Sequence, residues 1–276
     1  MESEVLRDNI KKAVLDVREK KPMAPSITNT VTVNLVANTQ LAVGGSAAMV
    51  YQEDEALALA SISDSFYINL GTIFDFYMDT FRPLGEYFNK TNHKWVLDPV
   101  AAGLGKIRNE ALLFFKECKP SIIRGNASEI LAVSEIWELS LGDNNKARGV
   151  ESEDEVDSAR EAAILIARET GGVVSVSGKS DLVTDGKIVV RLHGGSHYME
   201  KITGAGCSLG GVCAVYECVT DPLTAAITAS QIYNVAAKKA EERCKGPGSF
   251  EREFLDELYN VSADEVANNE LEIEVL

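Results

Sequence analysis

The sequence contains little of what zinc-binding or membrane proteins need. Its five cysteines form no CxxC pair, and together with three histidines they offer no zinc-binding spacing. An odd number of cysteines without a disulfide framework indicates reduced thiols, as in the cytoplasm. No segment approaches the ~18 apolar residues of a membrane-spanning helix, and residues 1–21 lack the apolar centre of a signal peptide. We therefore expect a cytoplasmic protein with no membrane partner.

Basic residues are also scarce. Lys and Arg total 27 against 42 Asp and Glu, which gives a formal net charge of −15. This balance argues against nucleic acid and anionic membranes as main partners. A few backbone donors, an arginine and a metal ion still suffice to bind a small polyanion such as ATP. The 276 residues, 45% of them hydrophobic, predict one α/β domain over 1–276, with a poorly ordered acidic tail from residue 263.

Strand-like and helix-like segments alternate along most of the chain. Short apolar runs predict strands at 46–50, 66–70, 94–97, 121–123 and 172–177, and helical segments separate most of them. The Asp185-Gly186 pair predicts a hairpin over 181–190. Asp221 and Pro222 predict the start of a long helix. This rhythm indicates an α/β fold with a central, mostly parallel sheet and helices on both faces.

The most informative stretch is 201–211, where Gly204 and Gly206 directly precede an apolar run. Glycines allow a sharp turn and a close approach to a ligand. A helix that begins there would present unpaired N–H groups and the positive end of its dipole, a combination that binds phosphate. No GxxxxGK[ST] segment occurs, so the P-loop class is excluded.

Polar residues follow several predicted strands, at the edge where ligands bind in open α/β sheets. They are Asp98, Arg124, Glu129 and Ser177. Asp98 alone could equally be a helix cap. As a set, however, an arginine for phosphate oxygens, two carboxylates for Mg²⁺ and a backbone anion site are the parts of a phosphoryl-transfer site.

Two features closer to the N-terminus each allow two interpretations. Asn29, Asn34 and Asn38 are poor interior helix residues, so they either cap turns or form a polar wall that binds a small ligand. Met49 ends a run of small residues and by itself is more typical of core filling than of ligand contact.

Taken together, these motifs resemble the hydroxyethylthiazole kinase family, a ribokinase-like family of thiamine salvage. Residues 203–207 read TGAGC, similar to the family's TGTGC, and residues 123–130 match IRGNASEI throughout. Further similar segments are ITN at 27–29, GGSAAM at 44–49, NLGT at 69–72, LDPV at 97–100, VTDG at 183–186 and GPGSF at 246–250. The resemblance extends in order over residues 22–258.

The resemblance implies a ribokinase-like fold and ATP-dependent phosphorylation of the hydroxyl of 4-methyl-5-(2-hydroxyethyl)thiazole. Carried over by position, Met49, Gly204 and Asn29 would contact the thiazole. Arg124 and Ser177 would contact ATP, with Asp98 and Glu129 beside Mg²⁺. A homotrimer with active sites between subunits is also implied.

The sequence departs from the family pattern near the expected substrate. Pro25-Ser26 stand where a histidine is usual, Ala47-Ala48 replace Pro-Val, and Ala205 replaces a threonine. The alternative is therefore a ribokinase-like kinase for another small heterocyclic alcohol. A dehydratase on the same fold and a non-catalytic binding protein are two further alternatives.

Cys207 stands where most ribokinase-like enzymes carry an aspartate base. A helix N-terminus can lower the pKa of a thiol, and a thiolate could accept the alcohol proton. Phosphoryl transfer nevertheless depends mainly on positioning and charge stabilisation. We predict that Cys207 positions the hydroxyl and assists the reaction modestly, the alternative being a small buried residue that faces the substrate.

Overall fold

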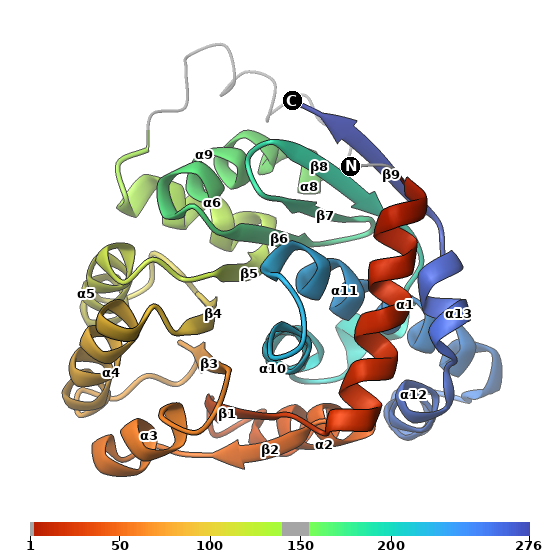
Figure 1. Cartoon of the computed structure of the whole chain (residues 1–276), viewed down its shortest axis with the longest axis horizontal. Helices are drawn as coiled ribbons and strands as arrows, with labels where there is room; N and C mark the ends of the chain where they lie inside the picture. The colour runs from red at the N-terminus through yellow and green to blue at the C-terminus, as the bar shows by residue number, and fades with distance from the viewer. Residues whose placement is uncertain (1–2, 140–154) are drawn as a thin grey trace.

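The protein is described here from a computed structural model, which describes residues 3–139 and 155–276. In that part of the chain one nine-stranded sheet runs in the order β2-β1-β3-β4-β5-β6-β7-β8-β9 (Figure 1). The parallel strands are β1 (Met23–Ile27), β2 (Ser46–Met49), β3 (Ser65–Asn69), β4 (Lys94–Asp98), β5 (Ile122–Asn126) and β6 (Val173–Ser177). The antiparallel strands are β7 (Asp181–Thr184), β8 (Ile188–Leu192) and β9 (Leu271–Val275). The predicted mostly parallel sheet is confirmed.

Helices cover both faces of the sheet, because successive strand residues point to opposite sides. On β4, Val96 packs into one apolar core, whereas Trp95 and Leu97 pack into the other. The first core lies under α1 (Ser3–Lys20), α2 (Val33–Ala42), α10 (Ala205–Glu217), α11 (Pro222–Arg243), α12 (Pro247–Asn260) and α13 (Ala263–Asn268). The second lies under α3 (Glu53–Ala60), α4 (Tyr77–Thr91), α5 (Lys106–Glu117), α6 (Ala127–Ile136), α8 (Glu155–Ser158) and α9 (Arg160–Thr170). Figure 1 shows the two sets on either side of the sheet.

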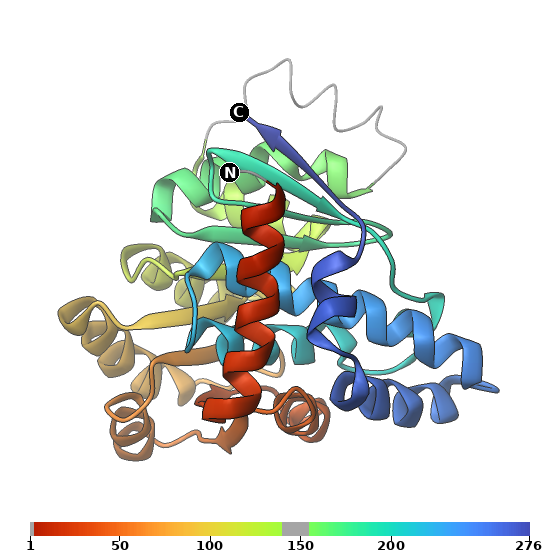
Figure 2. The same cartoon turned by 45° about the vertical axis from the view of Figure 1, so that its right-hand side comes forward.

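Helix α10 is the most enclosed helix near the sheet. Nearly all of its residues are buried, in keeping with a sequence that is apolar all round. It contacts β3 and β4 on one side and α2 and α11 on others, and α1 passes outside α10 and α11 (Figure 2). A short 3-10 helix, η1 (His197–Lys201), leads into its N-terminus. The sheet and the surrounding helices therefore hold the start of α10 in one place.

The acidic tail is ordered, contrary to our expectation. Residues 263–268 form α13, and β9 pairs with β8 along its whole length. Arg7 of α1 donates hydrogen bonds of 2.6 and 2.9 Å to the carbonyl oxygens of Ala267 and Asn269. In β9, glutamates alternate with aliphatic residues, the pattern of a strand with one solvated face. The prediction of a poorly ordered tail rested on its acidic composition and did not consider this alternation.

Strand β1 is absent from the predicted strands because it contains Pro25, which has no N–H for a strand ladder. It nevertheless lies between β2 and β3, and β3 pairs only with its last two residues, Ser26 and Ile27. Among residues 3–139 and 155–276, no helix is both long and apolar enough to cross a membrane.

Candidate active site

The carboxyl ends of the central strands bring the predicted polar residues together. In the sheet register Asn69 of β3 lies opposite Asp98 of β4, and Asn126 of β5 lies opposite Ser177 of β6. The N-terminus of α10 meets the same edge, because Tyr67 of β3 is 2.6 Å from the carbonyl oxygen of Cys207. The predicted residues Asp98, Arg124, Ser177 and Cys207 therefore belong to one site.

Asp98 is fully buried and has one engaged and one free oxygen. Its Oδ2 accepts hydrogen bonds of 2.9 Å from the Tyr67 hydroxyl and the Asn69 amide, and it lies 3.4 Å from Arg124 Nη1. Its Oδ1 has no hydrogen-bond partner in the part of the chain that the structure describes. Burial raises the pKa of Asp98 to about 6, against the lowering effect of Arg124. A buried, unpartnered carboxylate oxygen is a suitable ligand for a hard divalent cation or for its water.

Arg124 extends from β5 between Asp98 and Ser177. Its Nη2 donates to Ser177 Oγ at 3.0 Å, and its side chain is nearly buried. Burial disfavours its charge, but Asp98 and Glu129 more than offset this effect and raise the pKa of Arg124. The guanidinium also lies against α10, since a Cβ at Gly206 would be 2.9 Å from both of its terminal nitrogens. Gly206 therefore allows a fixed positive charge beside the helix N-terminus.

The first turn of α10 has the geometry predicted for an anion site. Gly204 is the N-cap residue and has a φ of +91°, which favours glycine. A Cβ there would also lie 2.6 Å from Thr32 Cγ2. The first N–H groups of a helix have no intrahelical partner and carry the positive end of its dipole. With Arg124 beside them, these donors form a site for a phosphate or another anion.

Cys207 lies in this turn and is half-buried. The Asn29 amide lies 3.5 Å from its sulfur atom and donates to it. Burial and the nearby Asp98 carboxylate raise the pKa of Cys207, although Arg124 opposes them. The shift is opposite to the lowering that a helix N-terminus favours, so the side chain is a thiol rather than a thiolate at neutral pH.

Asn29 connects the start of α2 to this cluster. Its amide nitrogen donates to Asn69 Oδ1 at 2.9 Å as well as to Cys207. Its Oδ1 accepts from the backbone N–H groups of Val31 and Thr32 at 3.1 Å. The capping interpretation is therefore confirmed for Asn29. Its place beside Cys207 is compatible with the polar wall, but contact with a ligand stays a prediction.

Glu129 has a local structural role. It forms a capping box with Asn126, in which Asn126 N donates to Glu129 Oε2 and Glu129 N donates to Asn126 Oδ1, both at 2.9 Å. Its Oε1 accepts from Ala101 N at 3.1 Å. Its charge nonetheless acts on Asp98 and Arg124. With both oxygens engaged, Glu129 is suited to act on a metal ion through water or through its charge.

Met49 lies apart from these groups. It ends the edge strand β2, which β1 separates from β3, and its half-buried side chain packs against the core. Its assigned contact with the thiazole stays a prediction.

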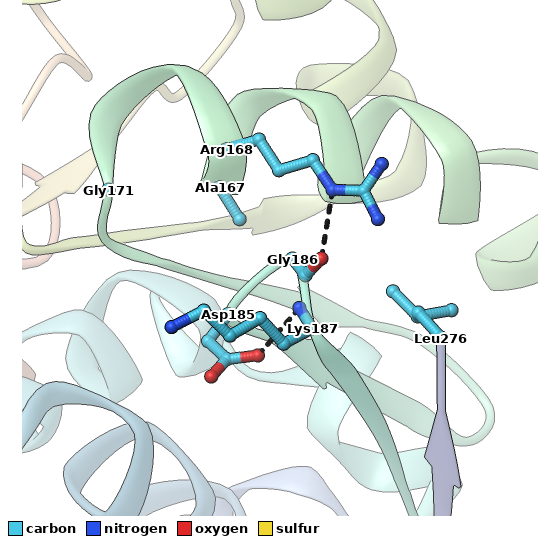
Figure 3. A pocket seen from close by; sticks show the side chains of 7 residues that line it. All are labelled: Ala167, Arg168, Gly171, Asp185, Gly186, Lys187 and Leu276. Carbon is cyan, nitrogen blue, oxygen red and sulfur yellow. Dashed lines mark hydrogen bonds between the residues drawn. The ribbon is translucent and has the colours of Figure 1, made fainter.

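In the described part of the chain, one hollow lies away from the buried cluster and a second lies beside it. The larger has a volume of about 530 Å³ and lies at the amino end of β6, opposite Ser177, as its residues from α9 and the β7–β8 turn indicate. Figure 3 shows its lining, with Arg168 Nε donating to the Gly186 carbonyl oxygen. The smaller, of about 310 Å³, lies beside the Gly204 loop and includes Val31, Asn34 and Thr203. The larger hollow therefore has no part in the site.

Tyr67 and Asn69 are site residues that the sequence analysis missed as individual candidates. They alternate along the end of β3, so both side chains point to the same face of the sheet and both reach Asp98. Polar side chains at every second position of β3, at Ser65, Tyr67 and Asn69, are the signal that could have identified them.

Comparison with known proteins agrees with this geometry. Residues 14–264 match the model of the hydroxyethylthiazole kinase family. The chain is 49% identical over 285 aligned positions to a hydroxyethylthiazole kinase from Bifidobacterium longum subsp. infantis, covering 96% of this chain and 91% of that protein. A solved structure of a hydroxyethylthiazole kinase from Pyrococcus horikoshii superimposes with a TM-score of 0.84 at 30% identity, covering 96% and 98% of the two chains.

A ribokinase-like superfamily protein from Enterococcus faecalis shares the fold alone, with a TM-score of 0.61 at 11% identity over 95% of this chain and 96% of that one. The predicted ribokinase-like fold is confirmed by these two solved structures together.

Proposed function

The chain belongs to the hydroxyethylthiazole kinase family, and we propose that it transfers the γ-phosphoryl group of ATP to the hydroxyl of 4-methyl-5-(2-hydroxyethyl)thiazole. The observation that supports this reaction most strongly is the arrangement around α10. A helix N-terminus, a buried arginine and a carboxylate with a free oxygen surround one point at the carboxyl edge of the sheet. Phosphoryl transfer needs these three groups, because its catalysis is mainly positioning and charge stabilisation.

The site residues would have the following roles in the reaction. Arg124, held by Asp98 and Ser177, would bind phosphate oxygens of ATP, with Ser177 beside it. The N–H groups of the first turn of α10 would stabilise the charge that develops on the transferred group. Cys207, as a thiol, would position the alcohol together with Asn29. Gly204 and Met49 would line the thiazole pocket.

Asp98 and Glu129 are the residues that would hold Mg²⁺. The fit rests on Asp98 Oδ1, which is buried and has no hydrogen-bond partner among the described residues. Glu129 would act through water, since both of its oxygens accept backbone hydrogen bonds. When bound, a divalent cation neutralises phosphate charge during the transfer.

Two further parts of the proposal concern the whole protein. We propose a homotrimer in which the sites lie between subunits, which agrees with the position of Met49 at the end of β2, an edge strand of the sheet. We also propose a cytoplasmic location, which agrees with five free thiols. Size-exclusion chromatography with light scattering tests the trimer directly, and a monomeric mass would contradict it.

A coupled assay of ADP release tests the reaction. With ATP, Mg²⁺ and a panel of small alcohols, the thiazole alcohol should give the highest kcat/KM, and its phosphate should accumulate with ADP. A matched thiazole without the hydroxyl should give only background ADP release. The absence of ADP release with any thiazole alcohol would refute the proposal. A preference for a different heterocyclic alcohol would support the alternative, a ribokinase-like kinase with another substrate.

A further inference from the structure

The hydroxyl of Tyr67 joins two parts of the site. It is fully buried, lies 2.9 Å from Asp98 Oδ2 and 2.6 Å from the Cys207 carbonyl oxygen, and accepts a hydrogen bond from Asn69 at 2.9 Å. A phenol has one hydrogen to donate, so this hydrogen is shared between the end of β4 and the first turn of α10. The ordinary pKa of a tyrosine is about 10, so the hydroxyl carries this hydrogen at neutral pH.

Gly210 makes room for the ring of Tyr67. A Cβ at Gly210 would lie 2.4 Å from Cε2 and 2.7 Å from both Cζ and the hydroxyl oxygen of Tyr67. Any side chain at position 210 would therefore displace the ring from the site. Gly210 lies inside α10, where glycine is an unfavourable helix residue. The glycine and the shared hydroxyl are two separate observations that point to the same arrangement.

We propose that Tyr67 is a positioning residue for phosphoryl transfer. Its hydroxyl holds the first turn of α10 at a fixed distance from Asp98, and its ring fits against α10 because Gly210 has no side chain. This inference rests on the proposed function. The N–H groups of α10 and the free oxygen of Asp98 would act on the same phosphoryl group from different sides. A misplacement of about 1 Å between reacting groups can lower a rate by about 10²-fold. Tyr67 would thus act through its two neighbours, without contact to the substrate.

The variant Tyr67→Phe tests the hydroxyl with the ring kept in place. We expect kcat for the thiazole alcohol to fall about tenfold, the effect of one lost hydrogen bond to a charged group. Both KM values and the affinity for ADP, measured by calorimetry, should stay within a factor of about two, because Arg124 and the α10 donors remain. The unfolding temperature should also fall, because buried groups lose hydrogen bonds. ADP binding therefore separates the two roles, since a residue that only supports the fold would weaken ADP binding as well.

Tyr216→Phe is the matched control. Tyr216 is also fully buried and also belongs to α10, but its hydroxyl has no hydrogen-bond partner within the described residues. This variant should keep the wild-type kcat. Equal losses of kcat in both variants would overturn the proposal, because they would reflect any change of a buried tyrosine next to the helix.

Gly210→Ala tests the second half of the proposal. It should lower kcat at least as much as Tyr67→Phe, and it should also lower the unfolding temperature because the ring is displaced. In Tyr67→Leu/Gly210→Ala the shorter side chain should restore much of the unfolding temperature while kcat stays low. Recovery of kcat in that double variant, or a wild-type kcat in Tyr67→Phe, would overturn the positioning role.

An incorrect proposed function would give a different experimental result from an incorrect positioning role. In that case the wild-type protein itself would release no ADP with the thiazole alcohol. The same variants would then be compared on whichever alcohol of the panel the wild type accepts, and a wild-type rate for Tyr67→Phe on that alcohol would again refute the positioning role.

Discussion

Replacing Gly206 with alanine should separate the stability of α10 from its role in the site. The new Cβ would lie 2.9 Å from both terminal nitrogens of Arg124 and 3.2 Å from its Cζ. The guanidinium would have to move by about half an ångström to reach ordinary contact distances. It cannot do so freely, because Asp98 lies at 3.4 Å and Ser177 at 3.0 Å from its nitrogens.

The expected changes in the free energy of unfolding and in kcat differ in size. Alanine in place of a helical glycine stabilises by about 1 kcal/mol, whereas weakening a hydrogen bond to a charged group costs about 1.5–3 kcal/mol. The free energy of unfolding should therefore fall by only about 0.5–2 kcal/mol. The effect on kcat should be larger, about 10–100-fold, since the transfer step is sensitive to small displacements of the charged groups.

Urea denaturation would measure the stability, and the coupled ADP assay would measure kcat. Gly211→Ala is the matched control, because its Cβ would meet Val36 Cγ1 at the same distance, 2.9 Å, on the same helix. That variant should lose stability but keep its kcat. A Gly206→Ala enzyme with the wild-type kcat, next to a destabilised Gly211→Ala, would refute the reasoning that Arg124 is held in place for catalysis.

Three other predictions concern individual side chains. Arg124→Lys should lower kcat/KM for ATP by about 10–100-fold in the same assay, since one ammonium cannot keep both the Asp98 and the Ser177 contacts. Cys207→Ser should keep kcat within about tenfold, because phosphoryl transfer needs little base catalysis; a complete loss would contradict this. Burial raises the pKa of Asp181 to about 6, above its value in the unfolded chain, so its contribution to stability is present below about pH 4 and is lost as the pH rises through 6. Urea titrations of Asp181→Asn should therefore show a smaller fall in unfolding free energy between pH 4 and 6, by about 2 kcal/mol.

The part of the site that lies on strand ends was predictable from the sequence. Asp98, Arg124 and Ser177 follow or end apolar runs, and parallel pairing brings such ends to one edge. Their partners were harder to predict, because a hydrogen bond such as that between Tyr67 and the Cys207 carbonyl joins residues 140 positions apart. No local pattern encodes such a separation, although the polar alternation of Tyr67 and Asn69 indicates which face they share.

The fold shows the same division between local and distant causes. The alternation of strand-like and helix-like segments predicted the parallel sheet, because the hydrophobic periodicity of each strand and helix is local to its own segment. Strand β1 was missed because Pro25 opposes strand pairing locally, whereas its neighbours β2 and β3 supply the pairing from outside. The tail was misjudged because Arg7, near the other end of the chain, contributes to its order through the carbonyl oxygens of Ala267 and Asn269.

Cys207 illustrates why a residue's position in the sequence does not determine its chemistry. The helix N-terminus and Arg124 both favour a thiolate, and the hydrogen bond that Asn29 donates to the sulfur atom acts in the same direction. Burial and the Asp98 carboxylate oppose them, and the pKa of the thiol rises. In the proposed function the carboxylate would have another role, because its free oxygen suits a cation. A cation bound at Asp98 would lower the pKa of this thiol again, so the interpretation that Cys207 positions the alcohol rests on its burial and on the small part that base catalysis plays in phosphoryl transfer.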